Sequence, residues 1–322
     1  MEVRIATLNI FFFPEGFVGN KRSNADMEMI RDVIRRLDSD IIVFQEIYDL
    51  GKLEQLMANV IPGRTYSMRD QAGHWAASNM GPDMKVPLAF DTNKLELLEV
   101  GSARNADDPP ADMSRRDAVA GRFKRRDGQS SFTVVGVHLK SGYLNVGPTT
   151  DPDDIMRTGQ MANLTRWITT LAPILPGGNQ RPASEPTVLI GDFNAVRGNM
   201  ALTPLLQGGN LSTWHWPEPR FASALSPAPV EVNLSQDERW TTHLDKKIID
   251  HVIVSPETKM IGDPWAYAFD YDGAWLHAAG VTKQWLEHFG YTFHPVNKPP
   301  RVKENLHHIT DHRPVRVSID LD

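Results

Sequence analysis

The chain has 322 residues, a net charge of -6, 41% hydrophobic residues and no cysteine. This composition is typical of a globular protein with a sizeable core, and its acidic balance argues against a surface that coats nucleic acid broadly. The absence of cysteine excludes disulfides, thiolate metal ligands and a cysteine nucleophile.

No stretch of the sequence approaches the roughly 18 apolar residues of a membrane span. The N-terminal residues also lack the basic region, the apolar region and the cleavage site of a signal peptide. This start fits a cytoplasmic protein, or a secreted or periplasmic one from which a leader was removed. The sequence therefore leaves the localisation open.

The first sixty residues predict alternating strands and helices. Residues 3–8 form an apolar strand, and the apolar run after it stops at Pro14. Residues 24–37 carry apolar side chains at helical spacing, and residues 41–44 are expected to form a second strand. A shorter helix is expected around residues 53–60.

Short strands dominate the middle of the chain. They are expected at residues 88–90, 95–100, 118–124 and 132–138, with turn residues between them. Asp127-Gly128 predicts a hairpin between the last two of these strands.

A long amphipathic helix is expected next, with an apolar face formed by Ile155, Met161, Leu164, Trp167, Ile168 and Leu171. Further strands are expected at residues 187–190, 240–242, 248–254 and 315–319. Clusters of strands interrupted by helices are typical of an α/β sandwich, here within a single domain spanning residues 1–322.

Residues 256–305 form the least regular segment, which is rich in aromatic residues, glycine and proline. We interpret this segment as an insertion in the domain. It is either a folded excursion with a small core of its own, or a lid or wall beside the substrate.

Asp192 and Asn194 follow the strand at residues 187–190, in the run Gly-Asp-Phe-Asn. Residues two apart on a strand point to the same face, so this carboxylate and carboxamide can act on one atom. A water to be activated is such an atom. An Asp-Asn turn that only caps the strand end is the structural alternative.

Other polar residues interrupt apolar strands at corresponding places. They are Asn9, Glu46, His138, Asp250, Asp311 and His312. An unpaired buried carboxylate is costly, so these side chains are expected to meet at one edge of the sandwich. The result would be a cleft lined by carboxylates, imidazoles and amides.

This constellation resembles the endonuclease/exonuclease/phosphatase family, whose fold is similar to that of deoxyribonuclease I. The matching motifs are Thr7-Leu-Asn9, Phe44-Gln-Glu46, His138-Leu-Lys-Ser141, Gly191-Asp-Phe-Asn194, Ile249-Asp-His251 and Thr310-Asp-His-Arg-Pro314. Each motif is weak alone, but together they follow the family's order. The resemblance implies a four-layer α-β-β-α sandwich, in which two mixed β-sheets pack together and helices lie outside. It also implies phosphoester hydrolysis that depends on Mg²⁺ or Mn²⁺.

The resemblance further implies which residues hold the metal. Glu46 would be the principal ligand, and oxygen donors of this kind suit Mg²⁺. Asn9 would orient Glu46 or contact the metal-bound phosphate oxygen. Asp311 would be a second carboxylate near the metal.

The resemblance also implies the catalytic groups. Asp192 would orient or deprotonate the attacking water, and Asn194 would hold that water or the developing phosphorane. Asp250 would fix the tautomer of His312, which could then donate to the phosphate as a cation. His138 would contact the phosphate or protonate the leaving oxygen.

Two cations are candidates for substrate binding. Arg116 resembles the family's phosphate-contacting arginine, although Arg115 is adjacent and either could be solvated. Lys140 could add positive charge, with a solvated lysine as the alternative.

Several departures from the family weaken an assignment to abasic-site repair, and one of them is the long interval between Asp250 and Asp311. Residues 85–90 hold no acid to partner His138, no lysine-bearing turn follows Glu46, and His251 stands where that branch has a tyrosine.

Two other interpretations of the sequence are open. A zinc site could be formed by His307, His308, Asp311 and His312, but the sequence around Pro314 favours a turn into a strand, where helical ligand spacing fails. The chain could also be a catalytically silent binding protein on the same scaffold, although the metal acid, the water-activating acid and the terminal histidine all persist.

Three substrate classes compete within the enzyme interpretation. A nuclease would need a basic groove, for which Lys124-Arg-Arg126 is a candidate edge. A phospholipid phosphodiesterase would need an exposed apolar element, and a phosphatase acting on inositol phosphates or small phosphoesters would need a narrow cationic pocket. We expect a phosphodiesterase, with a nuclease favoured by analogy. A monomer is expected, and peripheral contact with lipid stays open.

Overall fold

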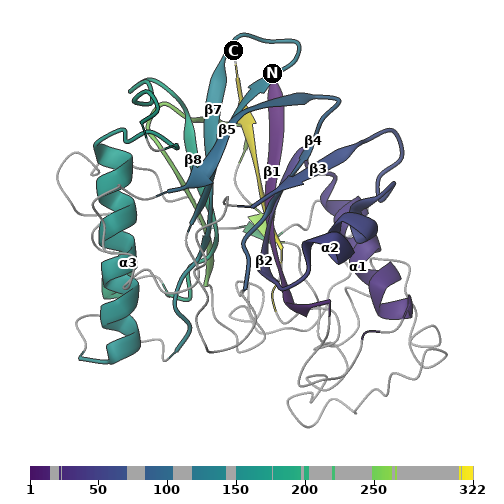
Figure 1. The fold of residues 1–322 in the computed structure, drawn as a ribbon, viewed down its shortest axis with the longest axis horizontal. Coiled ribbons are helices and arrows are strands. Elements are labelled where there is room, and N and C mark those ends of the chain that lie inside the picture. The colour runs from purple at the N-terminus through teal and green to yellow at the C-terminus, as the bar shows by residue number, and fades with distance from the viewer. Residues whose placement is uncertain are drawn as a thin grey trace.

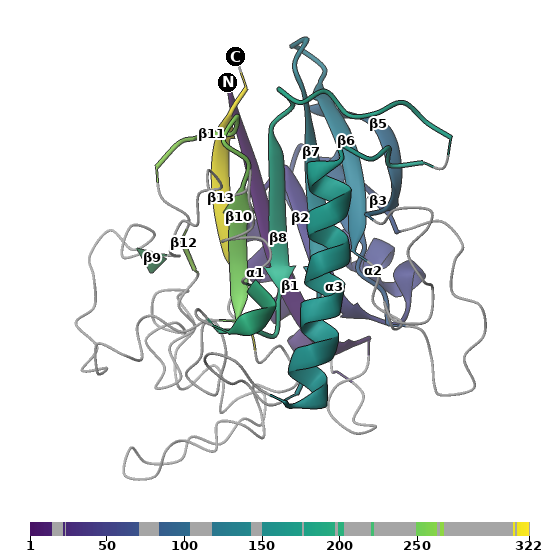
Figure 2. The same cartoon turned by 90° about the vertical axis from the view of Figure 1, so that its left-hand side faces the viewer.

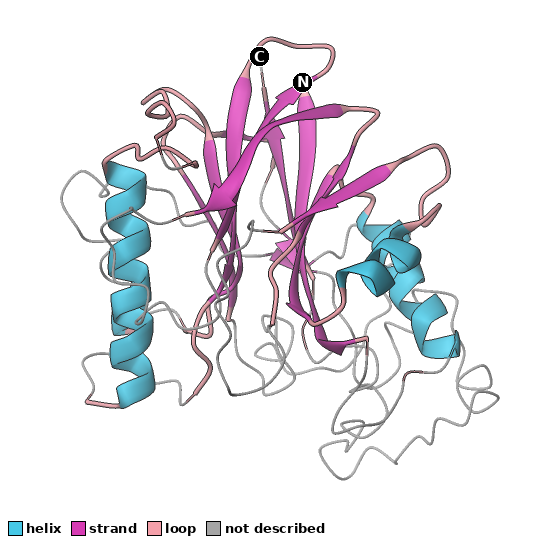
Figure 3. Cartoon of the chain, viewed as in Figure 1, coloured by secondary structure: helices cyan, strands magenta, loops and turns pink. Residues whose placement is uncertain are grey.

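The computed structural model describes residues 1–14, 22, 24–70, 84–103, 118–142, 150–175, 177–196, 199–202, 220–221, 249–262, 265–266, 312 and 314–321. Two β-sheets pack face to face in this part of the chain, and helices cover their outer faces (Figures 1 and 3). The α/β class and the four-layer α-β-β-α sandwich expected from the sequence are therefore confirmed.

The larger sheet has eight strands among the described residues, in the order β3-β4-β2-β1-β13-β12-β9, with β11 also paired with β13. Their bounds are β1 (Glu2–Phe13), β2 (Ile41–Ile47), β3 (Tyr66–Arg69), β4 (Leu88–Asp91), β9 (Arg220–Phe221), β11 (Lys259–Met260), β12 (Trp265–Ala266) and β13 (Val315–Asp320). β1 runs parallel to β2 and antiparallel to β13. The two ends of the chain therefore lie together at one end of the sandwich (Figure 1).

The smaller sheet has five strands in the order β10-β8-β7-β6-β5. Their bounds are β5 (Leu95–Ser102), β6 (Val119–Arg125), β7 (Ser131–His138), β8 (Thr187–Asp192) and β10 (Asp250–Val254). β7 and β8 run parallel, and the other neighbours are antiparallel. β6 and β7 form the hairpin that Asp127-Gly128 predicts.

Helices α1 (Asn24–Leu37) and α2 (Leu50–Met57) cover the outer face of the larger sheet, and α3 (Pro152–Thr169) covers the smaller one (Figures 1 and 2). Side-chain caps begin two of them: Asp49 accepts from the backbone N–H of Lys52, and Asp151 accepts from that of Asp153. A 3₁₀ turn, η2 (Met200–Leu202), follows the smaller sheet's β8. None of the helices in the described residues combines the length and apolar character that crossing a membrane requires.

Strand alternation builds the three hydrophobic layers of the sandwich. On β1, Val3 and Ile5 point between the two sheets, whereas Ala6 and Leu8 point towards α1 and α2. The outer face of the smaller sheet packs against α3, where Leu164 and the other apolar side chains of the helix are buried. Because the region between the sheets is apolar along most of its length, any polar side chain on this face needs a partner.

The structure corrects two details of the sequence interpretation of α3. Ile155 was placed on the apolar face, but it is 54% exposed. Leu171 was also included, but the helix ends at Thr169 and Leu171 has a left-handed φ of 52°. The core face of the first half of α3 is instead polar.

The strands of the structure differ in part from those expected from the sequence. Strands β3 and β9 were not predicted, and residues 240–242 lie outside the described residues. Within the predicted insertion at residues 256–305, β11 and β12 pair with β13 and extend the larger sheet. Residues 263–264 and 267–305 lie outside the described residues, so the role of the segment as a lid or separate core stays a prediction.

Candidate active site

The polar side chains of the smaller sheet gather at one end of the space between the sheets. On β8, Val188 and Ile190 lie in the core between the sheets, and Asp192 is the next residue on that face. His138 on β7 and Asp250 on β10 are the register partners of Asp192. Three neighbouring strands therefore bring two carboxylates and an imidazole to one place, at the end of the sandwich away from the chain termini.

Asn9 supplies the link from the larger sheet. It occupies the same inward face of β1 as Ile5, and its side chain is fully buried. Its Nδ2 atom donates to Oε1 of Glu46 at 3.2 Å and to Oδ2 of Asp192 at 3.3 Å. One carboxamide thus joins a carboxylate of each sheet.

The Asp192 carboxylate lies at the centre of the cluster. Its Oδ1 accepts the backbone N–H of Asn194 at 2.8 Å, and its Oδ2 accepts the Asn194 side-chain amide at 3.1 Å. Two imidazole nitrogens approach the same Oδ2, Nε2 of His138 at 3.5 Å and Nε2 of His312 at 3.6 Å. Asp192 and Asn194 therefore form a turn at the end of the strand, and the same turn holds the Asp192 carboxylate among the other polar side chains.

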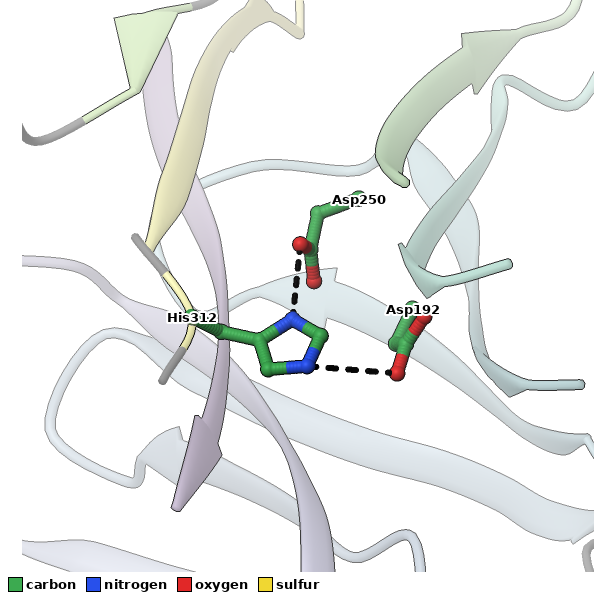
Figure 4. A group of neighbouring side chains, drawn as sticks. All are labelled: Asp192, Asp250 and His312. Carbon is green, nitrogen blue, oxygen red and sulfur yellow. Dashed lines mark hydrogen bonds and ion pairs between the residues drawn. The ribbon is translucent and has the colours of Figure 1, made fainter. Parts of the chain in front are cut away.

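His312 lies between two buried carboxylates (Figure 4). Its Nδ1 is 2.8 Å from Oδ2 of Asp250, which is the pairing that the sequence predicts. Since Asp250 can accept a proton-bearing Nδ1, the other ring nitrogen is left facing Asp192. His312 is therefore oriented with Nε2 towards the centre of the site.

Glu46 reaches the site through a local departure from strand geometry. Strand alternation alone would turn it away from the space between the sheets, but Glu46 has a φ of 61°. Its carboxylate lies 3.9 Å from Nε2 of His138, and its side chain is 13% exposed. A left-handed glutamate is strained, and such strain is concentrated at functional positions.

Gly191 lies within β8, immediately before Asp192, at a position that requires glycine. Its φ is 149°, and a Cβ atom there would lie 2.1 Å from the backbone oxygen of Val137. The close approach of β7 and β8 at this point sets the position of His138 relative to Asp192. Asn194, with a φ of 47°, completes the turn.

Burial is the main reason that the pKa of the Asp192 carboxyl is raised to about 7, and the Asp250 and Glu46 carboxylates contribute to this rise. His312 and the backbone N–H of Asn194 oppose this rise. A carboxyl group with a pKa in this range can exchange a proton near neutral pH, as a general base must.

Two sets of side chains could hold a cation. Asp192, Asp250 and His312 each offer a ligand atom, and these atoms lie within 4.8 Å of one another. Because Nδ1 of His312 faces Asp250, Nε2 is the ring nitrogen left to ligate a cation or to donate a hydrogen bond. Glu46, with Asn9 beside it, offers oxygen donors and is the more accessible acid. This oxygen donor set fits Mg²⁺ or Mn²⁺.

The remaining predicted residues fall into two groups. Lys140 donates from Nζ to the backbone oxygen of Ser141 and forms an ion pair with Asp153 at 2.9 Å. Arg116 and Asp311 lie outside the described residues, as do His307 and His308 of the zinc alternative.

The sequence interpretation missed polar residues that lie just behind the site. Thr7 and Gln45 are fully buried and hydrogen-bond to each other between the sheets, at 2.8 Å from Gln45 Nε2 to Thr7 Oγ1. Asp154, Arg157 and Gln160 are buried on α3. The only sequence signal for the α3 residues is their spacing, which places them on one face of the helix.

The fold and this cluster of acids, amides and imidazoles define a phosphoester hydrolase. The Endonuclease/Exonuclease/phosphatase family model matches residues 6–269, and the chain belongs to this family. The resemblance found in the motifs is thereby confirmed.

Solved structures of similar fold extend over the whole chain. The catalytic domain of human nocturnin, with a bound sulfate, has a TM-score of 0.60 at 15% identity and covers 100% of this chain and 95% of that chain. An endonuclease/exonuclease/phosphatase from Bacteroides vulgatus has a TM-score of 0.59 at 16% identity and covers 100% of both chains. A mannosyl-6-phosphatase from Bacteroides thetaiotaomicron has a TM-score of 0.55 at 17% identity, over 99% of this chain and 100% of that chain. A comparison with curated proteins finds no match.

Proposed function

We propose that the protein is a divalent-metal-dependent phosphodiesterase in which Asp192 activates the attacking water. The observation that carries this proposal is the convergence on one oxygen, Oδ2 of Asp192, of Nε2 of His138 at 3.5 Å and Nε2 of His312 at 3.6 Å. An acid flanked by two imidazoles can take a proton while neighbouring groups bind a phosphate.

Asp192 acts as the general base in this proposal. Asn194 engages both carboxylate oxygens and holds the group in one orientation. Oδ2 then takes the proton of the water, and the raised pKa of about 7 suits that transfer. Asn194 is proposed to help to hold the water.

The two imidazoles act on the phosphate. Asp250 stabilises a protonated His312, whose Nε2 can donate to a phosphate oxygen that gains charge in the transition state. His138 donates to a second phosphate oxygen or protonates the leaving oxygen.

Glu46 and Asn9 would hold the metal, with Asp311 as a second carboxylate. When bound, a Mg²⁺ or Mn²⁺ ion would neutralise charge on the phosphate oxygens. The strained φ of Glu46 supports this role, because the strain turns its carboxylate towards Asn9. Arg116 is proposed to contact the phosphate. Lys140 would do so only if its ion pair with Asp153 opened.

A nucleic acid is the first substrate that we propose, by analogy with the commonest use of the family. A phosphatase or phospholipase acting on small phosphoesters, inositol phosphates or phospholipids is the second candidate. The structural similarity to a mannosyl-6-phosphatase favours the phosphatase among these.

A substrate panel tests the proposal. Plasmid DNA, an abasic oligonucleotide, RNA, sphingomyelin, inositol phosphates, mannose 6-phosphate and bis-p-nitrophenyl phosphate are each incubated with the protein and Mg²⁺ or Mn²⁺. Turnover of a diester that chelator abolishes is expected. Turnover of monoesters alone would replace the phosphodiesterase with the phosphatase. Binding without turnover of any substrate would support a catalytically silent protein and overturn the proposal.

A further inference from the structure

The first half of α3 turns three polar side chains towards the smaller sheet. Asp154, Arg157 and Gln160 are at most 1% exposed, on the side of the helix that continues with the buried Met161 and Leu164. A charged pair buried in this way does little for stability, because apolar residues of similar size serve as well or better. Stability alone therefore does not explain why this charged pair is buried in the core.

The contacts of these side chains lead to one residue just beyond β7. Arg157 donates from one guanidinium nitrogen to the backbone oxygen of Lys140 at 2.7 Å, and Gln160 accepts the backbone N–H of Lys140 at 2.9 Å. Both backbone groups of Lys140 are thus held by α3. Since β7 ends at His138, this segment continues past the strand's own hydrogen bonds.

Asp154 ties a second segment to the same place. It accepts from the other terminal nitrogen of Arg157 and from Nδ2 of Asn199 at 2.8 Å. Asn199 in turn accepts the backbone N–H of Ala201 at 2.9 Å. Asn199 lies five positions after Asn194 in the chain, so the segment that follows the Asp-Asn turn is held by the same carboxylate.

Leu139 connects this network to the site. Its backbone N–H donates to the backbone oxygen of Asp192 at 3.0 Å, and its backbone oxygen accepts Nδ2 of Asn194 at 3.0 Å. The two residues of the segment 139–140 therefore join α3 on one side to Asp192 and Asn194 on the other. His138 is the residue immediately before them.

We propose that Asp154, Arg157 and Gln160 are positioning residues, which hold the Leu139–Lys140 backbone so that His138, Asp192 and Asn194 keep their mutual geometry. This inference rests on the proposed function of that site. Displacements of about 1 Å in such a site can lower turnover by about 100-fold. The network acts from the outer helical layer and touches no reacting atom.

A double variant separates positioning from stability. In Asp154→Asn/Arg157→Met, the buried charges are removed together and the introduced carboxamide can still accept from Asn199, so the fold should tolerate the change. With bis-p-nitrophenyl phosphate, we expect kcat to fall by about tenfold or more while KM stays within about twofold. An unchanged kcat would overturn the proposal.

The control is a second charge pair beside the smaller sheet, in which Glu185 is buried and the side chain of Arg122 is 22% exposed. Glu185 accepts from Nε of Arg122 at 2.7 Å and from Oγ1 of Thr133 at 2.6 Å, near the opposite end of β7 from His138. Arg122→Met/Glu185→Gln makes the equivalent change away from the site, and its kcat should match that of the wild type. An equal loss in this control would show a general effect of disturbing the smaller sheet and would overturn the proposal.

A third variant and a readout without turnover complete the test. Gln160→Met removes the hydrogen bond to the backbone N–H of Lys140 without removing a charge. It covers the case in which the double variant does not fold, and it should also lower kcat. The imidazole NMR signals of His138, assigned with a His138→Gln variant, should shift in both α3 variants and stay in place in the control. Unmoved His138 signals would contradict positioning even if the wild type turned over no substrate, whereas absent turnover with shifted signals would count against the proposed function alone.

Discussion

Nδ1 of His312 lies 2.8 Å from Oδ2 of Asp250, across 62 positions of sequence. The two residues come from opposite sheets, because His312 precedes β13 and Asp250 begins β10. This pair fixes which nitrogen of His312 faces Asp192. A substitution of Asp250 therefore changes the hydrogen bonding of the imidazole and leaves the proposed base, Asp192, in place.

Asp250→Asn should lower turnover by about 100-fold or more. The amide keeps the shape of the side chain but cannot stabilise an imidazolium or enforce the same tautomer. Steady-state kinetics on the substrate identified by the panel measure the effect, and the thermal midpoint shows whether the variant is folded. Turnover within threefold of the wild type in a folded variant would remove His312 from its proposed role.

Because the pKa of Asp192 is raised, we expect the stability of the chelator-treated protein to depend on pH. Its folded-state pKa of about 7 lies above its ordinary value of 3.8. Between these values the folded state binds more protons than the unfolded state, so this contribution to stability is present at low pH and is lost as pH rises towards 7. Asp192→Asn lacks the titration. We therefore expect the wild type to lose stability relative to Asp192→Asn as pH rises from about 5 to about 8. Below the folded pKa, the difference in unfolding free energy should change by up to about 1.4 kcal/mol per pH unit. A constant difference across this range would show that Asp192 does not titrate as described.

Gly191→Ala should destabilise the protein by about 2 kcal/mol or more, because the new Cβ meets the backbone of Val137 and the left-handed φ disfavours alanine. Gly159 offers a matched control, since it lies exposed in α3 and a Cβ added there would meet nothing within 4 Å. Gly159→Ala should raise stability by about 0.5–1 kcal/mol. Urea unfolding measures both changes, and equal effects of the two substitutions would refute the account of the β7–β8 approach.

Because Glu46 is the proposed metal ligand, the rise in thermal stability on metal binding should depend on it. A ligand that binds only the folded state stabilises it by about 2.7 kcal/mol at 100 times its Kd, so Mg²⁺ or Mn²⁺ should raise the thermal midpoint of the wild type. Glu46→Gln should lose most of this rise. Glu54, exposed on the neighbouring helix α2, provides the control: Glu54→Gln should keep it. A full metal response in Glu46→Gln would move the proposed cation site elsewhere.

Much of the site could be predicted from the sequence because its residues interrupt apolar strands. Asn9, His138 and Asp192 each follow alternating buried residues on the inward face of a strand. Such local patterns show that a polar residue will be buried. They also show which side of a strand it occupies, and the order of the motifs supplied the family and the fold.

The errors arose where distant contacts decide the outcome. The apolar stripe of α3 suggested that Ile155 faces the core, but the first turns of this helix turn Arg157 and Gln160 inward to meet the backbone of Lys140. Neither that partner nor the pairing of Lys140 with Asp153 can be inferred from helical spacing alone. Likewise, the left-handed φ of Glu46, which turns its side chain towards the site, cannot be predicted from the residue type.

We propose that residues far apart in the sequence form one metal-dependent site for phosphoester hydrolysis around Asp192. The most direct test measures hydrolysis of bis-p-nitrophenyl phosphate by the wild type and by folded Asp192→Asn, first with chelator and then with excess Mg²⁺ or Mn²⁺. We expect metal to restore turnover to the wild type, and the Asp192→Asn variant to stay at least about 100-fold slower. Equal metal-restored rates in the two proteins would contradict it.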